Sequence, residues 1–225
     1  MEMVINGSFI SVIFAALLSY LIGSFPTAYA LGKLKGVDIF ASGSGNMGAT
    51  NIARIFGLRW GIGVWLWDSS KGIVAILLAR LILPNEDNNW FPSVLAGVMA
   101  IIGHNWSVWV TLLTGVVRGG KGAATAFGTL IMVAPAPVMV IVPFIACLVA
   151  VLITRYVSLG VLILFGTSMP WVYFYTAAHR EIIPVWPQLY ALLVMVLIIY
   201  RFRENIQRLL TGTERHLGDK SQPEA

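Results

Sequence analysis

Long apolar runs alternate with short polar segments along nearly the whole chain. The apolar runs cover residues 8–31, 60–83, 90–113, 123–154, 157–177 and 186–200. An α-helix needs about 20 predominantly apolar residues to cross the hydrocarbon core of a bilayer. Runs of this length predict membrane-spanning helices, the first of them interrupted by the Gly-Ser-Phe-Pro sequence at residues 23–26.

The run from residue 123 to 154 is long for one span and short for two. Pro135 and Pro137 lie near its middle, where a tight turn would divide it. We therefore expect two short helices that form a hairpin. The pattern as a whole predicts an all-α polytopic membrane protein with seven transmembrane helices.

Composition supports this class of protein. Hydrophobic residues make up 58% of the chain and charged residues 11%, and the mean hydropathy is +0.82, as expected for a polytopic membrane protein. The formal net charge of +5 comes from cations beside apolar spans, where they meet lipid head groups, so it does not indicate nucleic-acid binding. The one cysteine, Cys147, lies in mid-span and is expected to be chemically inert.

Lysine and arginine predict the orientation of the chain in the membrane. With seven spans, one side receives Lys33, Lys35, Arg54, Arg59, Arg118, Lys121, Arg155, Arg201, Arg203, Arg208, Arg215 and Lys220. The other side receives Arg80, Arg180 and the acidic residues Glu2, Glu86, Asp87 and Glu181. The positive-inside rule then places the N-terminus outside and the C-terminus in the cytoplasm. Residues 1–225 are expected to form a single domain whose cytoplasmic segments are 33–57, 114–122 and 201–225. The first span is long and lacks a basic start, unlike a cleavable signal peptide.

A small, polar, glycine-rich segment spans residues 42–54. It reads Ser-Gly-Ser-Gly-Asn-Met-Gly-Ala-Thr-Asn-Ile-Ala-Arg. Glycines let backbone N–H groups turn inward, so this segment can form an anion cradle, and Arg54 can add two hydrogen bonds to a phosphate. The alternative is a loop that only caps the following helix.

A second glycine-rich segment, residues 118–122, reads Arg-Gly-Gly-Lys-Gly. It resembles half of a P-loop but lacks the upstream glycine and the hydroxyl residue after the lysine. A flexible turn with one cation at the start of a helix can still bind an anion. The alternative is an ordinary positively charged turn at the end of a span.

Three ionisable residues inside the predicted spans could take part in chemistry. Asp68 and Lys71 share a helix face and can pair, either as a functional charge pair or as a structural one. His104 near the end of the third run could be a general base, but a structural hydrogen-bonding role is the more common one.

The polar tail begins at Arg201. Helical spacing places Arg201, Asn205 and Arg208 on one face, which by itself predicts a basic amphipathic helix on the membrane surface.

Taken together and in order, three segments resemble the signature motifs of the PlsY-type acyl-phosphate:glycerol-3-phosphate acyltransferases. They are Ser-Gly-Ser-Gly-Asn-x-Gly-Ala-Thr-Asn (42–51), Gly-His…Gly-Gly-Lys-Gly (103–122) and Asn-Ile-x-Arg-Leu-x-x-Gly-x-Glu (205–214). The sequence Asp-x-x-Lys-Gly at 68–72 matches a further feature of this family.

The resemblance implies an enzyme of phospholipid synthesis in the bacterial inner membrane, with its active site facing the cytoplasm. Its substrates would be a fatty acyl phosphate and glycerol 3-phosphate, and its product lysophosphatidic acid. An acyl phosphate is already activated, so no covalent intermediate, cofactor or metal is expected. A functional link to an enzyme that produces acyl phosphate is implied.

The resemblance also implies site residues. The implied catalytic residues are Ser44, Asn46, Lys121 and Asn205. The implied substrate- and phosphate-binding residues are Ser42, Gly45, Gly48, Thr50, Asn51, Arg54, His104, Gly119, Gly120, Gly122, Arg208 and Glu214. Asp68 and Lys71 are, from their spacing alone, candidates for a structural ion pair.

The chain departs from the family pattern in two places. Phe202 stands where the third motif usually has a histidine, three residues before the asparagine. Residues 112–116 resemble an insertion in the second motif.

Three other functions remain open at this stage. A relative of the family could accept a different substrate or bind lipid phosphate without turnover. A transporter of a phosphorylated solute would fit the anion-binding loops, although no inverted repeat is visible. A CDP-alcohol phosphotransferase would need clustered aspartates, whereas Asp38, Asp68 and Asp219 are widely separated.

Overall fold

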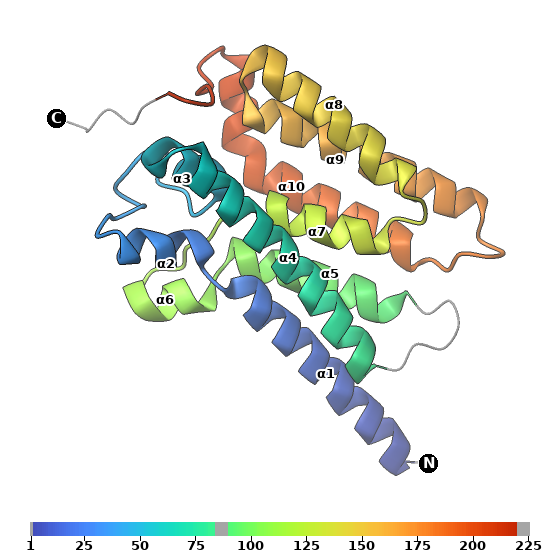
Figure 1. Cartoon of the computed structure of the whole chain (residues 1–225). Coiled ribbons are helices and arrows are strands. Elements are labelled where there is room, and N and C mark those ends of the chain that lie inside the picture. The colour runs from blue at the N-terminus through green and yellow to red at the C-terminus, as the bar shows by residue number, and fades with distance from the viewer. Residues whose placement is uncertain (1, 84–89, 220–225) are drawn as a thin grey trace.

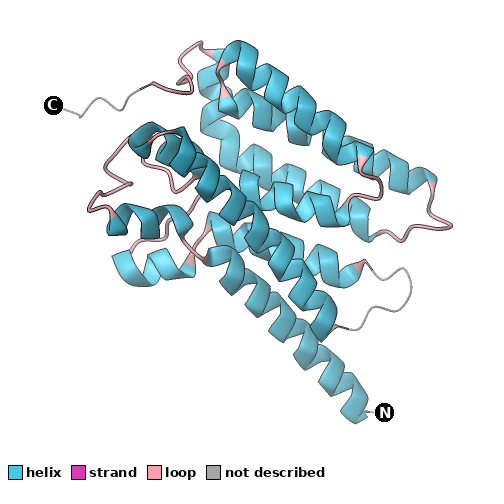
Figure 2. Ribbon diagram, viewed as in Figure 1, coloured by secondary structure: helices cyan, strands magenta, loops and turns pink. Residues whose placement is uncertain are grey.

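The computed structural model describes residues 2–83 and 90–219, and all regular structure in this part of the chain is helical (Figure 2). The helices are α1 (Glu2–Ser24), α2 (Thr27–Leu34), α3 (Ala49–Phe56), α4 (Leu58–Ile82), α5 (Phe91–Asn105), α6 (Val108–Thr114), α7 (Ala123–Val133), α8 (Val138–Thr154), α9 (Val157–Ala178) and α10 (Trp186–Leu210). The predicted all-α class is confirmed. The acidic loop at 84–89 and the end of the basic tail at 220–225, including Lys220, lie outside the described residues.

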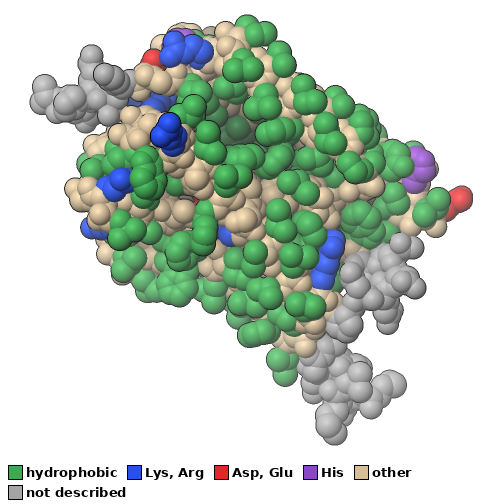
Figure 3. All heavy atoms as spheres, viewed as in Figure 1, with side chains coloured by type: hydrophobic (Ala, Val, Ile, Leu, Met, Phe, Trp, Pro, Cys, Tyr) green, Lys and Arg blue, Asp and Glu red, His purple; other side chains and the backbone are tan. Residues whose placement is uncertain are grey.

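Four helical stretches are long and apolar enough to cross a membrane: Phe9–Leu34, Leu58–Ile82, Phe91–Thr114 and Val157–Ala178. Many large apolar side chains on the outside of the helices are exposed, among them Leu81, Leu152 and Ile153, each more than three-quarters accessible. Figure 3 shows such side chains covering most of one face of the molecule. Because a water-soluble surface would not expose this much apolar area, the chain is an integral membrane protein.

The run from residue 123 to 154 forms two helices, as predicted, but they do not pair as a simple hairpin. α7 ends at Val133 and α8 begins at Val138, and the connection contains Pro135 and Pro137. α7 packs mainly on α4 and α5, whereas α8 packs mainly on α9. The prolines separate the two helices, and the surrounding bundle determines which neighbours each one takes.

The last helix continues beyond the predicted boundary at residue 200. α10 runs without a break to Leu210, and Phe202 and Asn205 on its final turns are buried. The expected separate amphipathic helix on the membrane surface is therefore wrong. These turns face the protein because the glycine-rich segments pack beside them.

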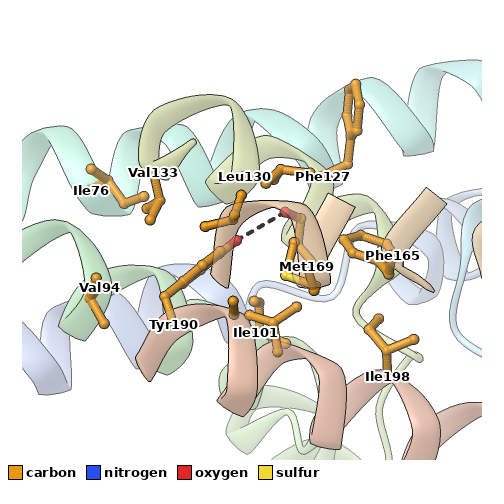
Figure 4. Packing of buried hydrophobic residues seen from close by; sticks show 14 of the residues in the cluster. Ile76, Val94, Ile101, Phe127, Leu130, Val133, Phe165, Met169, Tyr190 and Ile198 are labelled. Atoms are coloured by element: carbon orange, nitrogen blue, oxygen red, sulfur yellow. Dashed lines mark hydrogen bonds between the residues drawn. The ribbon is translucent and has the colours of Figure 1, made fainter. Parts of the chain in front are cut away.

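The buried core joins α4, α5, α7, α9 and α10. Tyr190 of α10, Leu130 of α7 and Phe165 of α9 are fully buried in it (Figure 4). The Tyr190 hydroxyl lies 2.8 Å from the Thr129 hydroxyl of α7, so the largest buried side chain keeps a hydrogen-bond partner inside the apolar core. This packing fixes α7, and with it the glycine-rich segment just before it.

Polar segments gather at one end of the bundle (Figure 1). α2, α3, α6 and the C-terminal segment lie at this polar end, and the start of α1 and the α7–α8 and α9–α10 connections lie at the opposite end. All three segments predicted to face one compartment are therefore at the same end of the molecule.

Gly128 of α7 provides a test of the helix packing. A Cβ at Gly128 would lie 1.9 Å from the Ser69 carbonyl oxygen of α4, so Gly128→Ala would force the two backbones apart. We expect a loss of about 1–3 kcal/mol in unfolding free energy, typical of overpacking, measured as a lower thermal midpoint in detergent.

Gly166 of α9 is the matched control, because a Cβ there would meet nothing within 4 Å. Gly166→Ala should leave the midpoint unchanged or raise it slightly, since alanine favours helix. Equal midpoints for the two variants would contradict the close contact between α4 and α7.

Candidate functional site

The first glycine-rich segment folds around the side chain of Asn51. Its Oδ1 accepts a hydrogen bond from Ser44 N at 2.7 Å, and its Nδ2 donates to Ile39 O and Ser42 O. Gly43 has φ +64°, and a Cβ there would lie 2.2 Å from Asn51 Oδ1. Asn51 thus shapes the loop through three backbone contacts, so we assign it a positioning role rather than the predicted phosphate contact.

The second glycine-rich segment is held against the end of α5. Gly120 N donates to His104 O at 2.9 Å, and Ser107 N donates to Arg118 O at 3.0 Å. Gly122 then starts α7 with φ +77°. These bonds fix the backbone on both sides of Lys121.

The third segment joins the second through side chains. Lys121 Nζ donates to Asn205 Oδ1, and Asn205 Nδ2 donates to Glu214 Oε1 at 3.0 Å. Glu214 Oε2 also accepts from Arg208 Nε at 3.0 Å. Since the Glu214 carboxylate is negative and already paired, it orients Asn205 and Arg208 and is not itself suited to hold a phosphate.

These segments surround a cavity of about 780 Å³, here called the large cavity. The predicted residues that line it are Ser44, Gly45, Asn46, Gly48, Thr50, Asn51, Arg54, Asp68, His104, Lys121, Gly122, Asn205, Arg208 and Glu214. Its other end is apolar, lined by Trp65, Phe127, Phe144, Cys147, Leu148, Val151, Val161, Leu164 and Phe165. Figure 3 shows a hollow among apolar side chains between α3–α4 and α8. The large cavity therefore suits a molecule with a charged head and an apolar tail.

Four predicted residues do not line the large cavity: Ser42, Lys71, Gly119 and Gly120. Ser42 O accepts bonds from Gly45 N and Asn51 Nδ2, so Ser42 helps to form the loop. Gly120 is a backbone attachment point for His104 and Arg201. These residues lie outside the large cavity and help to hold the residues that line it.

Asp68, Lys71 and His104 form one buried network. Lys71 Nζ lies 2.9 Å from Asp68 Oδ1, 3.0 Å from Phe25 O and 2.8 Å from His104 Nδ1. An ammonium group only donates, so His104 Nδ1 accepts and Nε2 carries the hydrogen. His104 is thus a hydrogen-bond donor at Nε2, and the general-base alternative loses support.

The sequence reasoning missed Ser158 and Arg215. Ser158 lies in the first turn of α9 and lines the large cavity, and its buried hydroxyl has no partner among the described residues. Arg215 also lines the large cavity, and its Nη1 donates to Gly43 O at 3.0 Å. A lone serine in an apolar run gives no local signal, whereas Arg215 could have been suspected from its place beside the third motif.

Electrostatics at the polar end favour a negatively charged ligand. Burial, assisted by the charge of Arg208, lowers the pKa of Lys121 to about 8. Burial also lowers the pKa of Arg54, assisted by Arg215. Cations held close together and partly out of water are stabilised by a bound anion.

Phe202 lies beside the cation of the second glycine-rich segment. Its ring is buried and lies 5.4 Å from Lys121 Nζ, within the range of a cation–π contact.

The predicted insertion at residues 112–116 comprises the end of α6 and its cap, Gly115, with φ +70°.

The fold and the site together define an integral membrane protein with a cavity at the polar end of its helix bundle that suits an amphiphilic anion. The profile of the family described as Glycerol-3-phosphate acyltransferase matches residues 13–212. This chain belongs to the glycerol-3-phosphate acyltransferase family.

Individual members of this family match most of the length of this chain. The glycerol-3-phosphate acyltransferase of Desulfotalea psychrophila is 37% identical over 88% of this chain and 94% of its own length. Glycerol-3-phosphate acyltransferase 1 of Deinococcus radiodurans is 38% identical over 94% of this chain and 98% of its own. The crystal structure of PlsY, an integral membrane glycerol 3-phosphate acyltransferase, in its glycerol 3-phosphate form has a TM-score of 0.78 to this chain. It is 35% identical over 92% of this chain and 96% of PlsY.

Proposed function

We propose that this protein transfers a fatty acyl group from acyl phosphate to the primary hydroxyl of glycerol 3-phosphate. The products are lysophosphatidic acid and inorganic phosphate. The observation that supports this most directly is the large cavity, which joins a cationic polar end to an apolar end between helices. Solved PlsY structures in a glycerol 3-phosphate form and a lysophosphatidic acid form have the same fold.

The two ends of the large cavity suggest how the substrates bind. The acyl chain lies among the apolar side chains of α4, α7, α8 and α9, such as Trp65, Phe144 and Leu164. The phosphates lie at the polar end, where Arg54 and Lys121 supply charge and Ser44, Asn46 and Thr50 line the wall. Asn205 orients glycerol 3-phosphate, and Ser158 supplies an unpaired hydroxyl. Close positioning of two substrates is itself a large part of catalysis.

The proposed reaction is a direct displacement. The acceptor hydroxyl oxygen bonds to the acyl carbonyl carbon, the bond from that carbon to the phosphate oxygen breaks, and the phosphate leaves. The hydroxyl proton passes to a substrate phosphate oxygen, because the side chains nearby are already engaged. His104 Nδ1 accepts from Lys71, and the Glu214 carboxylate accepts from Asn205 and Arg208. The mixed anhydride needs no enzyme nucleophile.

For topology, we propose a single domain with seven transmembrane helices in the bacterial inner membrane. The N-terminus is outside and the active site faces the cytoplasm. The clustering of the three motif segments at one end of the bundle supports this orientation (Figure 1), as does the distribution of lysine and arginine. α7 has 11 residues, about 16 Å of helix, so it would cross only part of the bilayer while packed inside the protein. The donor would come from an enzyme that produces acyl phosphate on the same side.

The function is tested with purified full-length protein, palmitoyl phosphate and radiolabelled glycerol 3-phosphate, with and without a metal chelator. We expect labelled lysophosphatidic acid and one phosphate released per product molecule, unchanged by the chelator. Without product from a folded protein, the assignment fails. Uptake of label into sealed vesicles without product would instead identify a transporter, and product with another acceptor would identify a relative of altered specificity.

A further inference from the structure

A second cavity, here called the small cavity, lies at the polar end behind the second glycine-rich segment. It has a volume of about 450 Å³ and is lined by Phe40, Gly45, Asn105, Trp106, Val117, Arg118, Gly119 and Arg201. This volume is within the range of about 300–1,000 Å³ found for small-molecule sites. Two of the lining residues are arginines and none is acidic.

Both guanidinium groups are supported by aromatic rings. The guanidinium carbon of Arg118 lies 4.9 Å from the centre of the Phe40 ring, and that of Arg201 lies 5.3 Å from the centre of the Trp106 ring. Arg201 donates from Nε and Nη2 to Gly120 O. In the described part of the chain its Nη1 has no recorded hydrogen bond, so those hydrogens remain for a ligand. Two stacked guanidinium groups that face one cavity make a site for a tetrahedral oxyanion.

Asn105 is a buried polar residue beside the small cavity. It is 1% exposed and lines the small cavity. Neither Nδ2 nor Oδ1 of its side chain has a hydrogen-bond partner among the described residues, and both atoms are shielded from solvent. Oδ1 lies beside Gly122, so the small cavity is polar chiefly through its two arginines.

The small and large cavities are separated by the glycine-rich backbone. Gly119 lines the small cavity, and Lys121 and Gly122 line the large one, while Gly45 and Arg201 line both. Gly119 and Gly120 have no side chains, so they place only backbone atoms between the two cavities. An anion bound at Lys121 is therefore separated from the small cavity by the backbone of this glycine-rich segment.

We propose that the small cavity binds inorganic phosphate released by the reaction and is its route to water. This inference rests on the proposed function. The lipid product keeps its chain in the apolar end and can leave into the bilayer, but phosphate is a dianion that needs a polar path. Arg118 lines the small cavity and is exposed at the polar end, so the small cavity reaches the solvent.

The test is calorimetric titration of the full-length protein in detergent with inorganic phosphate, at saturating glycerol 3-phosphate. We expect one phosphate per chain, and a loss of at least about tenfold in affinity in Arg118→Gln, since one charged hydrogen-bonding partner is removed. Asn105→Asp places a negative charge at the cavity and should weaken phosphate binding similarly. Arg59→Gln is the matched control: Arg59 is exposed at the same end and lines neither cavity, so affinity should not change.

The source of the bound phosphate group is distinguished by a second titration. Glycerol 3-phosphate alone should bind with a stoichiometry of one molecule per chain. Two molecules of glycerol 3-phosphate per chain, with inorganic phosphate displaced, would show that the small cavity is a phosphomonoester site. That result would overturn the assignment to released phosphate. No phosphate binding by the wild type, or equal affinity in Arg118→Gln, would also overturn it. The labelled-lipid assay is run in parallel. Turnover without phosphate binding refutes only the exit site. Phosphate binding without turnover refutes the acyl transfer and, with it, the assignment of the bound phosphate to a released product.

Discussion

Replacing Lys121 by methionine should reduce kcat/KM by about 10²–10³-fold, the usual effect of removing one preorganised charge from a catalytic site. Lys121 is the cation of the second motif that lines the large cavity, and its ammonium group lies between Asn205 Oδ1 and the Phe202 ring. Methionine keeps the unbranched side chain as far as Cε and an apolar contact with the ring, but it removes the ammonium group. The measurement is the rate of lysophosphatidic acid formation, with the thermal midpoint as a check of folding.

The pH dependence shows whether the charge is what matters. With a pKa of about 8, the ammonium form of Lys121 dominates below pH 8 and is lost above it. Wild-type activity should therefore fall as the pH rises through 8, two units or more below the range in which an ordinary lysine loses its charge. Lys121→Arg stays charged throughout and should keep partial activity without this fall. If Lys121→Met keeps more than about a tenth of wild-type kcat/KM, the proposed role is wrong.

Replacing Glu214 by alanine should lower kcat by about 10–100-fold although Glu214 does not face the phosphates directly, an effect of the size reported for supporting residues around a site. Its two oxygens hold Asn205 and Arg208. Without the carboxylate, Asn205 loses its anchor, and Lys121, which donates to Asn205, loses its fixed direction. Removing the negative charge also leaves Arg208 unpaired beside Lys121. The measurement is steady-state kinetics with both substrates varied.

The control for Glu214 is Glu181→Ala. Glu181 lies in the α9–α10 connection at the opposite end of the bundle, is exposed and lines neither cavity. A carboxylate this far from the large cavity is screened from the charges there, so its kinetics should match the wild type. A double variant of Asn205 and Glu214 should lose no more than either single variant, because the two act as one unit. Additive losses would contradict the proposed chain of contacts.

Much of the fold could be predicted because its signals are local. The lengths of apolar runs predicted the long helices, and Pro135 and Pro137 marked the break before α8. The 3.6-residue helical period placed Arg201, Asn205 and Arg208 on one face, and all three line the large cavity. Such features depend on neighbours a few residues away, which the sequence specifies directly.

The assignment of roles within the site was harder to predict. Asn51 and Glu214 belong to motifs, but Asn51 bonds the backbone and Glu214 bonds other side chains. A motif indicates that a residue type is needed, not which of its atoms faces a substrate. Hydrogen-bond partners distant in sequence decide that.

The sequence by itself determined the class of protein, the positions of the long apolar helices, the three polar segments and the family. Only the tertiary structure decided that Ser158 of α9 faces the large cavity, that Arg215 reaches back to Gly43, and that a second cavity lies behind Gly119. The reason is physical. Periodicity along a helix shows which face is apolar, but which side chains from distant segments meet depends on how the helices pack. That packing is set by close backbone contacts such as the one at Gly128, which one-dimensional patterns do not reveal.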